Sequence, residues 1–410
     1  TDPNTMEIVS IDPTYSFELA EDSPTTYYAL FNQTTTTSQT VGDSVYTIYN
    51  EAKLAEVTGT SSSFSHENGY VIPSIVTSNE NNFRVFSVNF SIGYPSITIP
   101  EGVVKVTGSG QYVTSYPSIT ISLPESLKYF GGSFHAVWGL TSISFPDGVT
   151  TIEATFSSCG DLTTVYLPSS LKSLKGAPGN ALGFISSASL EYIYGEGNDY
   201  YYVDDNRALI VDGGKTLIIY AGNSATSYLI PEGVTSIGDY AFSNCSDLTS
   251  ITLPSTLTSI DSRAFSNCSN LSSITIPEGV TSIGQAAFFN CSSLTSIALP
   301  STLTSIEYGV FNNCSNLTEI TLNGNISDFI YDVFSGCSNL TKLTLAANVT
   351  TLPSILFTDN NLTKLTEIVV EAGSSLSAAL PTYGKWVKDG GSDTQTNFTG
   401  AGTYTRTDIQ

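Results

Sequence analysis

The sequence predicts an elongated, β-dominated solenoid, and the main reason is a 23-residue repeat between Pro231 and Leu352. A fixed period of this length is typical of stacked coils, because one coil is too small to bury its own apolar side. Equivalent side chains should therefore form continuous columns. The columns are formed by Cys245, Cys268, Cys291, Cys314 and Cys337, by Phe242, Phe265, Phe288, Phe311 and Phe334, and by Leu248, Leu271, Leu294, Leu317 and Leu340.

A second observation is a short motif of an apolar, a polar and an apolar residue followed by proline. It ends at Pro100, Pro124, Pro146, Pro168, Pro231, Pro254, Pro277 and Pro300. The alternation predicts a short parallel strand in each coil, with Ile251 and Leu253 facing inward and Ser250 and Thr252 facing outward. Proline ends the strand because it has no N–H to donate to the sheet.

After the proline, each coil returns to the core through Leu257 and Ile260. We expect Ala264 and Phe265 to open a short helical or 3-10 turn that places Cys268 inside. Asparagines precede four of the cysteines, and we expect them to form a side-chain ladder that satisfies backbone groups of the turns. These are Asn244, Asn267, Asn290 and Asn313.

The chain is predicted to have five segments. Residues 1–92 lack the repeat and read as an N-terminal β-rich cap or small domain, because a solenoid needs its first apolar face covered. Residues 93–194 carry degenerate repeats, 195–227 an inserted β-meander, and 228–372 the regular 23-residue repeats. Residues 373–410 form a C-terminal cap or the start of a further module.

Six cysteines allow a disulfide or a metal interpretation, but five share one repeat position and Cys159 occupies the same position in an earlier coil. Residues in such a column point the same way, whereas a disulfide needs Cβ atoms that face each other. We therefore expect reduced, buried thiols. Zinc-type spacings are absent, and Asp204, Asp205 and Asp212 fit turns better than a calcium loop. We expect no metal and no cofactor.

Charge excludes several classes of partner. The chain has 14 basic and 37 acidic residues, a net charge of −23, which disfavours nucleic acid and anionic lipid. No apolar run is long enough to cross a bilayer, so we expect no membrane insertion. The first residues carry no signal-peptide pattern, so a signal or anchor of an exported protein would lie outside these residues.

The repeat has a family resemblance. The consensus CSxLTSIxLPxxLTSIxxxAFxN, matched closely by residues 268–290 and 291–313, resembles the BspA-like leucine-rich repeat of bacterial surface proteins. The resemblance is specific from about Tyr228 to Ala346 and weaker from Ile97 to Ile193. It implies a leucine-rich repeat solenoid, a right-handed β/α superhelix with a parallel sheet, on an extracellular or surface-displayed protein that adheres to host matrix proteins or cells.

Catalytic patterns are weak. Only two histidines occur, His66 in a polar turn and His135 at a variable position that we expect to be solvated, and no GxSxG nucleophile elbow is present. Glu101, Glu232 and Glu278 belong to a repeated Pro-Glu-Gly turn rather than to a carboxylate pair. The chain is therefore predicted not to be an enzyme.

Two surfaces are candidate binding sites for an extracellular protein or glycan. The first is the outward face of the strands, and the second is an aromatic patch in the inserted meander, since protruding loops often carry function on a rigid scaffold. We expect a monomer that adheres to host or matrix proteins; the alternatives are glycan binding or a spacer without a ligand. The candidate residues are Ser250, Thr252, Ser273, Thr275, Ser296, Glu319 and Thr321 on the strands, and Tyr200, Tyr201 and Tyr202 in the patch.

Overall fold

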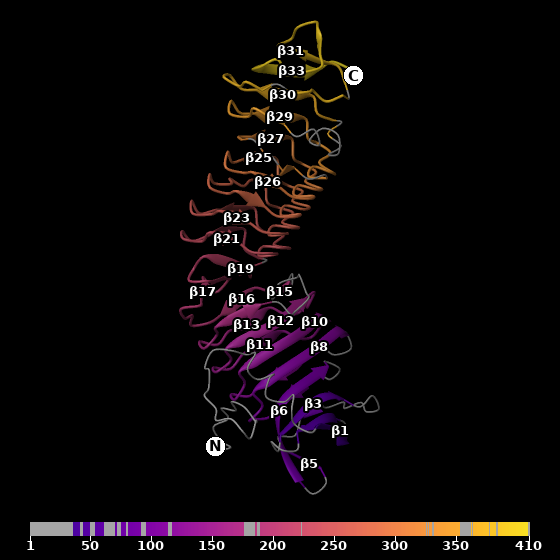
Figure 1. Ribbon diagram of the computed structural model, residues 1–410, viewed down its shortest axis with the longest axis vertical. Coiled ribbons are helices and arrows are strands. Elements are labelled where there is room, and N and C mark those ends of the chain that lie inside the picture. Colours follow the sequence, from indigo (N-terminus) through magenta and orange to yellow (C-terminus); the bar gives the residue numbers. More distant parts are fainter. Residues whose placement is uncertain are drawn as a thin grey trace. The chain divides into compact units, whose positions relative to one another are not determined.

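The computed structural model divides into two compact units, which are described separately: unit 1 is Thr1–Asn206 and unit 2 is Arg207–Gln410. In each unit the strands stack in successive coils (Figure 1). The structure describes residues 36–41, 44–49, 54–60, 70–71, 75–78, 81–91, 96–113, 117–175, 185–186, 189–222, 224–324, 326, 328–329, 332–352, 362, 364–376, 378–382 and 384–408. Residues 1–35 of the predicted cap, and with them much of that prediction, lie outside this set.

The strands of unit 1, apart from β17, form one long sheet and two shorter ones. The strands of this unit are β1 (Thr36–Val41), β2 (Ser44–Tyr49), β3 (Leu54–Thr60), β4 (Tyr70–Val71), β5 (Ile75–Ser78), β6 (Asn81–Ser91), β7 (Ser96–Thr98), β8 (Lys105–Val113), β9 (Thr120–Ser122), β10 (Tyr129–Val137), β11 (Ser142–Ser144), β12 (Thr151–Ser157), β13 (Thr164–Tyr166), β14 (Ser173–Lys175), β15 (Ile185–Ser186), β16 (Tyr192–Tyr194) and β17 (Tyr201–Asp204). The long sheet has the order β1-β2-β3-β6-β8-β10-β12-β14, antiparallel up to β3 and parallel afterwards. The shorter sheets are β4-β7-β9 and β11-β13-β16, both parallel.

Parallel pairing begins earlier than the first predicted repeat at Ile97. Strand β4 pairs with β7, and β6 pairs with β8, so the first coil lies within the segment predicted as a cap. The sequence contains the cue, because Val71, Ile72 and Pro73 repeat the strand-and-proline motif in a shortened form.

Unit 2 contains the regular repeats. Its strands are β18 (Ala208–Val211), β19 (Thr216–Tyr220), β20 (Ser227–Leu229), β21 (Ser236–Ile237), β22 (Ser250–Thr252), β23 (Ser259–Ile260), β24 (Ser282–Ile283), β25 (Ser296–Leu299), β26 (Ser305–Ile306), β27 (Glu319–Leu322), β28 (Asp328–Phe329), β29 (Lys342–Leu345), β30 (Glu367–Val370), β31 (Trp386–Lys388), β32 (Thr394–Gln395) and β33 (Gly402–Arg406). One sheet runs through β18-β19-β21-β23-β24-β26-β28, and another through β25-β27-β29-β30-β33-β31-β32.

Part of the inserted meander is a component of the solenoid. Strands β18 and β19 form an antiparallel hairpin, and β19 then pairs in parallel with β21 of the first regular coil. The hairpin thus gives the regular sheet its first neighbour. At the other end, β30 pairs with β33 in antiparallel fashion, and β31 and β32 continue that pattern.

The core of unit 2 is one continuous cluster of buried side chains that extends from Ala208 to Tyr404. The predicted phenylalanine column lies inside it, and successive rings from Phe242 to Phe334 stack with centroids 5.1–5.7 Å apart. Each coil therefore buries its apolar side against its neighbours, as the repeat predicts.

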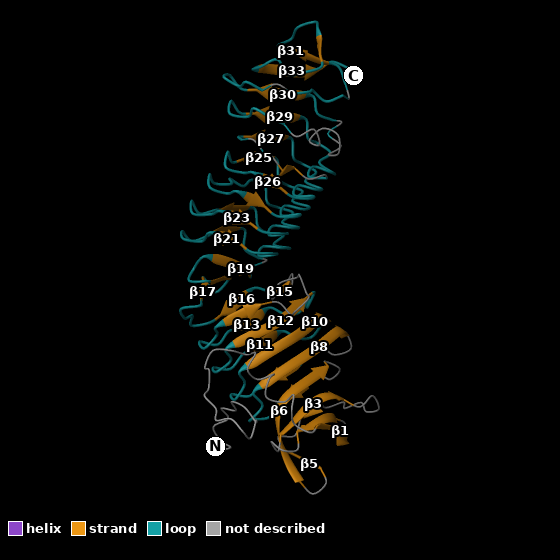
Figure 2. Cartoon of the chain, viewed as in Figure 1, coloured by secondary structure: helices purple, strands orange, loops and turns teal. Residues whose placement is uncertain are grey.

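The segment that leads to each cysteine of unit 2 is a run of turns, and no described residue lies in a helix (Figure 2). The absence of a helix follows from the hydrogen bonds of successive N–H groups, which alternate between the same coil and the next one. Ala241 and Cys245 donate to carbonyls three residues back in their own coil, whereas Phe242 donates to Ala264 O of the next coil at 2.7 Å. A helix needs consecutive bonds within one segment, and here every second N–H bonds to the next coil instead.

Candidate binding surface

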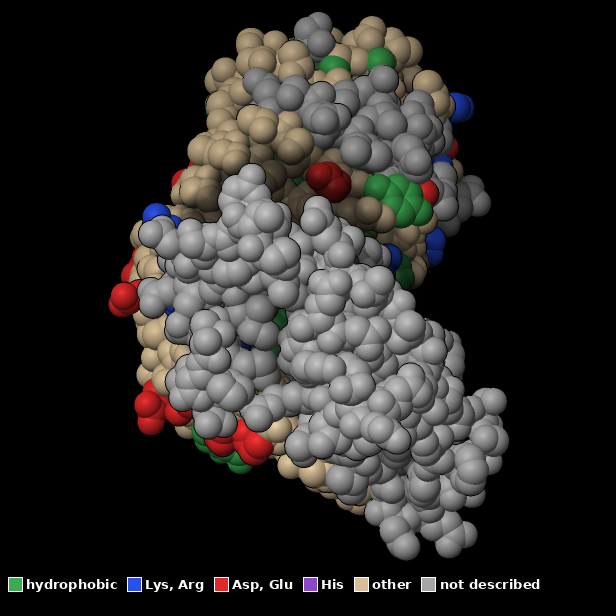
Figure 3. Space-filling model, turned by 60° about the horizontal axis from the view of Figure 1, so that its bottom comes forward, with side chains coloured by type: hydrophobic (Ala, Val, Ile, Leu, Met, Phe, Trp, Pro, Cys, Tyr) green, Lys and Arg blue, Asp and Glu red, His purple; other side chains and the backbone are tan. Residues whose placement is uncertain are grey.

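The outward residues of the unit 2 strands form an exposed face, which we call the hydroxyl face. On β22, Ser250 and Thr252 are exposed while Ile251 between them is 7% exposed. On β25 the same alternation exposes Ser296 and Ala298. Ser273 and Thr275, in the coil between β22 and β25, are also exposed, although that coil pairs there through an isolated bridge from Ser250 to Ser273 rather than through a strand. Leu253, predicted to face inward, is half-buried and packs against the core. Much of the coloured surface in Figure 3 is likewise tan, the colour of uncharged polar side chains and backbone.

The hydroxyls of this face differ from those of the adjoining turns. Thr249, Ser272, Thr295 and Thr318 each donate to a carbonyl of the preceding coil, at 2.8–3.4 Å. Within the described part of the chain, the strand hydroxyls of Ser250, Thr252, Ser273, Thr275, Ser296 and Thr321 make no hydrogen bond to the protein. A hydroxyl can donate one hydrogen bond and accept others, so the strand hydroxyls can do so with a ligand.

Towards the C-terminal coils the face becomes charged. Glu319 on β27 pairs with Lys342 on β29 at 2.9 Å and accepts a hydrogen bond from Thr344 Oγ1 at 2.9 Å. The Lys342 ammonium holds the pKa of Glu319 below its usual value, and Glu319 in turn raises the pKa of Lys342. Because the Glu319 carboxylate already bonds to Lys342 and Thr344, we take Glu319 as the edge of the hydroxyl face and not as one of its free hydrogen-bonding groups.

The predicted aromatic patch in the meander is reduced to one exposed ring. Tyr201 is 1% exposed, and its hydroxyl donates to Pro168 O at 3.0 Å, which removes Tyr201 from any surface patch. The Tyr200 hydroxyl accepts the Leu174 N–H at 3.1 Å. Tyr202 is 36% exposed. An aromatic run on a strand alternates between faces, so three consecutive tyrosines cannot share one surface.

A different aromatic cluster lies on the outward face of unit 1. Tyr166 on β13 stacks on Tyr194 of β16, with centroids 5.1 Å apart and planes 17° apart, and Tyr192 stacks on Tyr194 at 6.0 Å. Tyr166 is 44% exposed and Tyr192 is 37% exposed. The sequence could have indicated this cluster, because tyrosines stand here at outward strand positions that hold serine or threonine in other coils.

The glutamates of the Pro-Glu-Gly turns hold neighbouring coils together. Glu278 accepts the Ser301 N–H at 3.1 Å and the Ser301 hydroxyl at 2.7 Å, and these bonds lower the pKa of Glu278. In return, the Gly279 N–H donates to Thr302 Oγ1 at 3.0 Å. Glu232 makes the same bonds to Ser255. Pro-Glu-Gly and Pro-Ser-Thr alternate from coil to coil in the sequence, because the glutamate of one turn bonds to the serine of the next and the threonine bonds back to the glycine.

His135, expected to be solvated, is half-buried on β10, and its Nδ1 lies 2.9 Å from Ser157 Oγ. Ser157 is 3% exposed, so this serine is out of reach of a substrate. The side chain of His66 lies outside the described residues. Among the described residues, no group of three or more His, Cys, Asp or Glu side chains is placed to hold a metal ion.

The cysteine column consists of buried thiols rather than disulfides, as predicted. The column has a further role, since the thiols of Cys268, Cys291 and Cys314 each donate to the carbonyl of a phenylalanine in the preceding coil at 3.1–3.2 Å. Burial raises the pKa of Cys245 and Cys291 to about 12. Such thiols stay protonated and unreactive at neutral pH.

The predicted asparagine ladder is present for three of its four residues, Asn244, Asn267 and Asn290, and it links side chain to side chain; Asn313 does not join it. Asn267 Nδ2 donates to Asn244 Oδ1, and Asn290 Nδ2 donates to Asn267 Oδ1, both at 3.0 Å. All three residues have a left-handed backbone, with φ between 59° and 66°. Asparagine tolerates this conformation better than most residues, so the backbone explains why asparagine recurs there.

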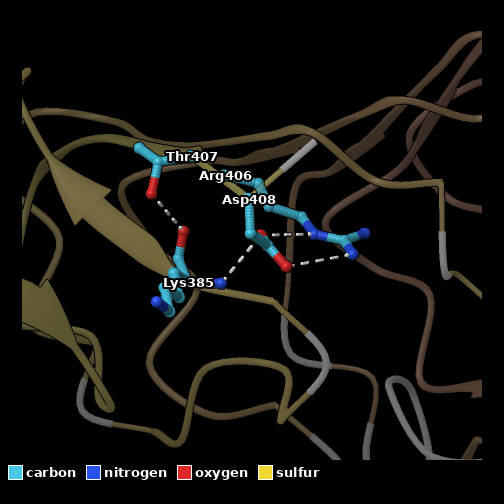
Figure 4. Close-up of polar contacts among 4 residues, drawn as sticks. All are labelled: Lys385, Arg406, Thr407 and Asp408. Carbon is cyan, nitrogen blue, oxygen red and sulfur yellow. Dashed lines mark hydrogen bonds and ion pairs between the residues drawn. The ribbon is translucent and has the colours of Figure 1, made fainter. Parts of the chain in front are cut away.

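The antiparallel strands after β30 are fastened by a small polar cluster (Figure 4). The Asp408 carboxylate accepts the Arg406 Nε–H at 3.0 Å and the Lys385 N–H at 2.9 Å. The Arg406 guanidinium is the main reason that the pKa of Asp408 is lowered. The Thr407 hydroxyl donates to Lys385 O at 3.2 Å. All four residues serve the fold here, because they join β31 and β33 through these contacts.

Comparison with known proteins agrees with this architecture. A family described as "BspA type Leucine rich repeat region" matches residues 71–177, 219–329 and 263–373, in six copies. No protein with a curated description matches the sequence. No helix among the described residues is long and apolar enough to cross a membrane.

Two solved structures are similar to the chain. The first is the pneumococcal vaccine antigen PcpA, with a TM-score of 0.63 and 17% identity, over 84% of this chain and 98% of PcpA. The second is a leucine-rich repeat protein from Eubacterium ventriosum, with a TM-score of 0.52 and 19% identity, over 85% of this chain and 97% of that one. At these identities the likeness concerns the fold.

Proposed function

The chain belongs to the BspA-type leucine-rich repeat family, and on that premise we propose that it is a secreted or cell-surface, non-catalytic protein that adheres to host or matrix proteins. The hydroxyl face of unit 2 is the proposed contact surface, and the chain acts as a monomer. The description of the similar PcpA as a vaccine antigen favours a surface location, since a vaccine antigen has to be reached by antibodies.

One observation carries the proposal: the strand hydroxyls of the hydroxyl face have no protein partner among the described residues, whereas the turn hydroxyls beside them do. An isolated bridge places Ser273 beside Ser250, and the register of β25 and β27 places Ser296 beside Glu319 and Ala298 beside Thr321. Paired parallel segments lie about 4.8 Å apart, so outward groups of adjacent coils lie in rows. A partner that matches the rows gains several hydrogen bonds at once on a preorganised surface, which lowers the entropic cost of binding.

Two features favour a binding role over catalysis. The glutamates that recur in the chain are occupied by backbone N–H groups of the adjacent coil. The thiols are buried, and burial keeps them protonated. Neither group offers the exposed nucleophile or the paired acid and base that hydrolytic chemistry needs.

The test compares two triple variants. The first replaces Thr252, Thr275 and Thr321 with alanine on the hydroxyl face. The second replaces Thr258, Thr281 and Thr304 in another turn column; Thr258, for example, donates to Thr235 O at 2.9 Å. Binding of immobilised collagen, laminin and fibronectin is measured by interferometry. We expect the first variant to weaken binding at least about tenfold, a loss of about 1.4 kcal/mol, and the second to bind normally.

Unaltered binding by the first variant would exclude the hydroxyl face. The absence of any protein ligand for the intact chain would instead favour the alternative of a spacer. Melting curves of both variants check that the fold is retained. Outward substitutions on the hydroxyl face should change stability little, whereas the turn variant loses hydrogen bonds between coils and should melt at a lower temperature.

A further inference from the structure

Tyr166 is an exposed aromatic residue on the outward face of unit 1. It lies in β13, where Val165 is buried and Tyr166 is 44% exposed. Its register partner on β16 is Tyr194, and the two rings stack face to face at 5.1 Å. One face of the Tyr166 ring is therefore covered by Tyr194.

The other face of the ring looks towards β11, where the register partner of Tyr166 is Ser144. Ser142 and Ser144 are both exposed, with Ile143 buried between them. A serine side chain ends one heavy atom beyond Cβ, so neither residue can cover a tyrosine ring. We call the exposed Tyr166 ring the wall, and the two short side chains beside it, Ser142 and Ser144, the floor.

The floor hydroxyls are available to a ligand. Within the described part of the chain, the Ser142 and Ser144 hydroxyls make no hydrogen bond to the protein. In contrast, the turn hydroxyls of Thr150 and Thr163 donate to carbonyls of the preceding coil, at 3.4 and 3.2 Å. The floor continues towards β9, which a bridge between Ile119 and Leu140 places beside β11 and which exposes Thr120 and Ser122.

These features define a ligand chemistry. An aromatic ring face packs against C–H groups, and serine hydroxyls donate and accept hydrogen bonds. A pyranose sugar presents both, C–H groups on its ring face and hydroxyls around its edge. The wall and floor contain no charged side chain, and the chain carries a net charge of −23, which disfavours sialylated or sulfated sugars.

We propose that Tyr166, Ser142 and Ser144 form a subsite for a neutral pyranose ring of an extracellular glycan. The sugar packs one face against Tyr166, and its hydroxyls bond to the two serines. Tyr194 is a positioning residue, because its stacking holds the Tyr166 ring upright before the ligand arrives. Tyr192 extends the stack behind Tyr194 at 6.0 Å.

The subsite is separate from the proposed contact surface for matrix proteins. It lies in unit 1, whereas the hydroxyl face lies in unit 2. Either proposal can therefore fail without the other, since the variants that test them do not overlap.

The experiment screens the intact chain on an array of neutral oligosaccharides of glucose, galactose and N-acetylglucosamine, with sialylated counterparts. The strongest neutral oligosaccharide is then titrated by saturation-transfer NMR. We expect Tyr166→Ala and Ser144→Val to weaken binding at least tenfold, by removing the wall and by filling the floor. Tyr166→Phe should retain binding, because the ring face remains.

Tyr308→Ala is the matched control, because Tyr308 is an exposed tyrosine of unit 2, 38% exposed, outside the subsite. It should bind the oligosaccharide normally. The proposal is overturned if no neutral oligosaccharide binds, or if Tyr166→Ala binds as the intact chain does. It is also overturned if Tyr166→Ala abolishes binding of a matrix protein instead, since the wall would then be a protein contact.

Discussion

The coils of unit 1 and unit 2 bring a phenylalanine into the core by different routes. In unit 1, Ile152 and Phe156 are four residues apart, both are buried, and the seven-residue strand β12 joins them without interruption. In unit 2, Ile237 and Phe242 are five residues apart, and strand β21 ends at Ile237. The coil that contains β12 spans 22 residues from Pro146 to Pro168, whereas the regular coils of unit 2 have proline intervals of 23 residues.

The reason is the alternation of side chains along a strand. Residues an even number apart share a face, so an extended chain can bury both Ile152 and Phe156. An odd spacing would turn Phe242 outward. In unit 2, one residue with a left-handed backbone lies in the intervening turn and reverses this outward direction, so that Phe242 points into the core. The equivalent residue of each coil has φ between 54° and 65°: Tyr240, Arg263, Ala286, Gly309 and Asp332. One residue per coil thus decides between a long strand and a run of turns.

A charge in the regular core should have the largest effect. Leu294 has no exposed surface and lies within the single cluster of unit 2. Leu294→Asp removes that packing and buries an unpaired carboxylate, so we expect it to destabilise unit 2 by at least about 4 kcal/mol. The measurement is denaturant unfolding followed by the fluorescence of Trp386, which is 1% exposed.

Ala298→Asp is the control for this variant, because Ala298 faces outward on β25 and is exposed. It should unfold close to the denaturant midpoint of the intact chain. A Leu294→Asp chain with an unchanged midpoint would contradict the continuous core.

Changing the spacing in unit 1 should have the next largest effect. A glycine inserted between Ala154 and Thr155 makes the distance from the isoleucine to the phenylalanine odd, so Phe156 turns out of the core. The cost should resemble the loss of a buried phenylalanine, about 3–5 kcal/mol. The same insertion after Gly213, where the hairpin turn has open space, should be tolerated. Equal melting temperatures of the two insertions would refute the parity argument.

The thiol column predicts a smaller, pH-dependent effect. Burial raises the pKa of Cys291 from 9.0 to about 12. Its stabilising contribution is therefore complete below pH 9 and is lost between pH 9 and 12, because the unfolded chain releases the proton first. Between pH 8 and pH 10, Cys291→Val should lose about 1.4 kcal/mol less stability than the intact chain. Parallel curves of stability against pH would contradict this.

In unit 1 the column contains one cysteine, Cys159, whose pKa is raised to about 11 by burial. Cys159→Val should show the same difference up to pH 10. The comparison between the two variants tests whether the thiols of both units respond alike despite the different routes of their coils.

The smallest effect concerns the left-handed residue itself. Ala286 has φ of 54° and Gly309, the equivalent residue one coil later, has φ of 65°. Ala286→Gly should raise the stability of unit 2 by about 1 kcal/mol, and Gly309→Ala should lower it by a similar amount, because a Cβ is unfavourable in this conformation. Calorimetry checks both, and the same sign for the two substitutions would refute the assignment.

Several features were predictable because each depends on the repeat alone. The period placed Phe, Cys and Leu in columns, which required buried thiols without disulfides, and the strand motif placed Ser250 and Thr252 outward. The patch at Tyr200, Tyr201 and Tyr202 was predicted from composition, and strand alternation buries its middle residue. The turns that replace the expected helical segment could have been predicted from the odd spacing between Ile237 and Phe242.

The sequence by itself determined the stacked coils, because identical spacings leave identical apolar side chains one way to be buried. Only the tertiary structure decided which polar groups are available. Ser142 and Ser144 become a floor, and Tyr166 a wall, because residues 22 or more positions apart become neighbours on adjacent strands. Whether a hydroxyl is satisfied depends on the coil beside it, and the local sequence does not contain that neighbour.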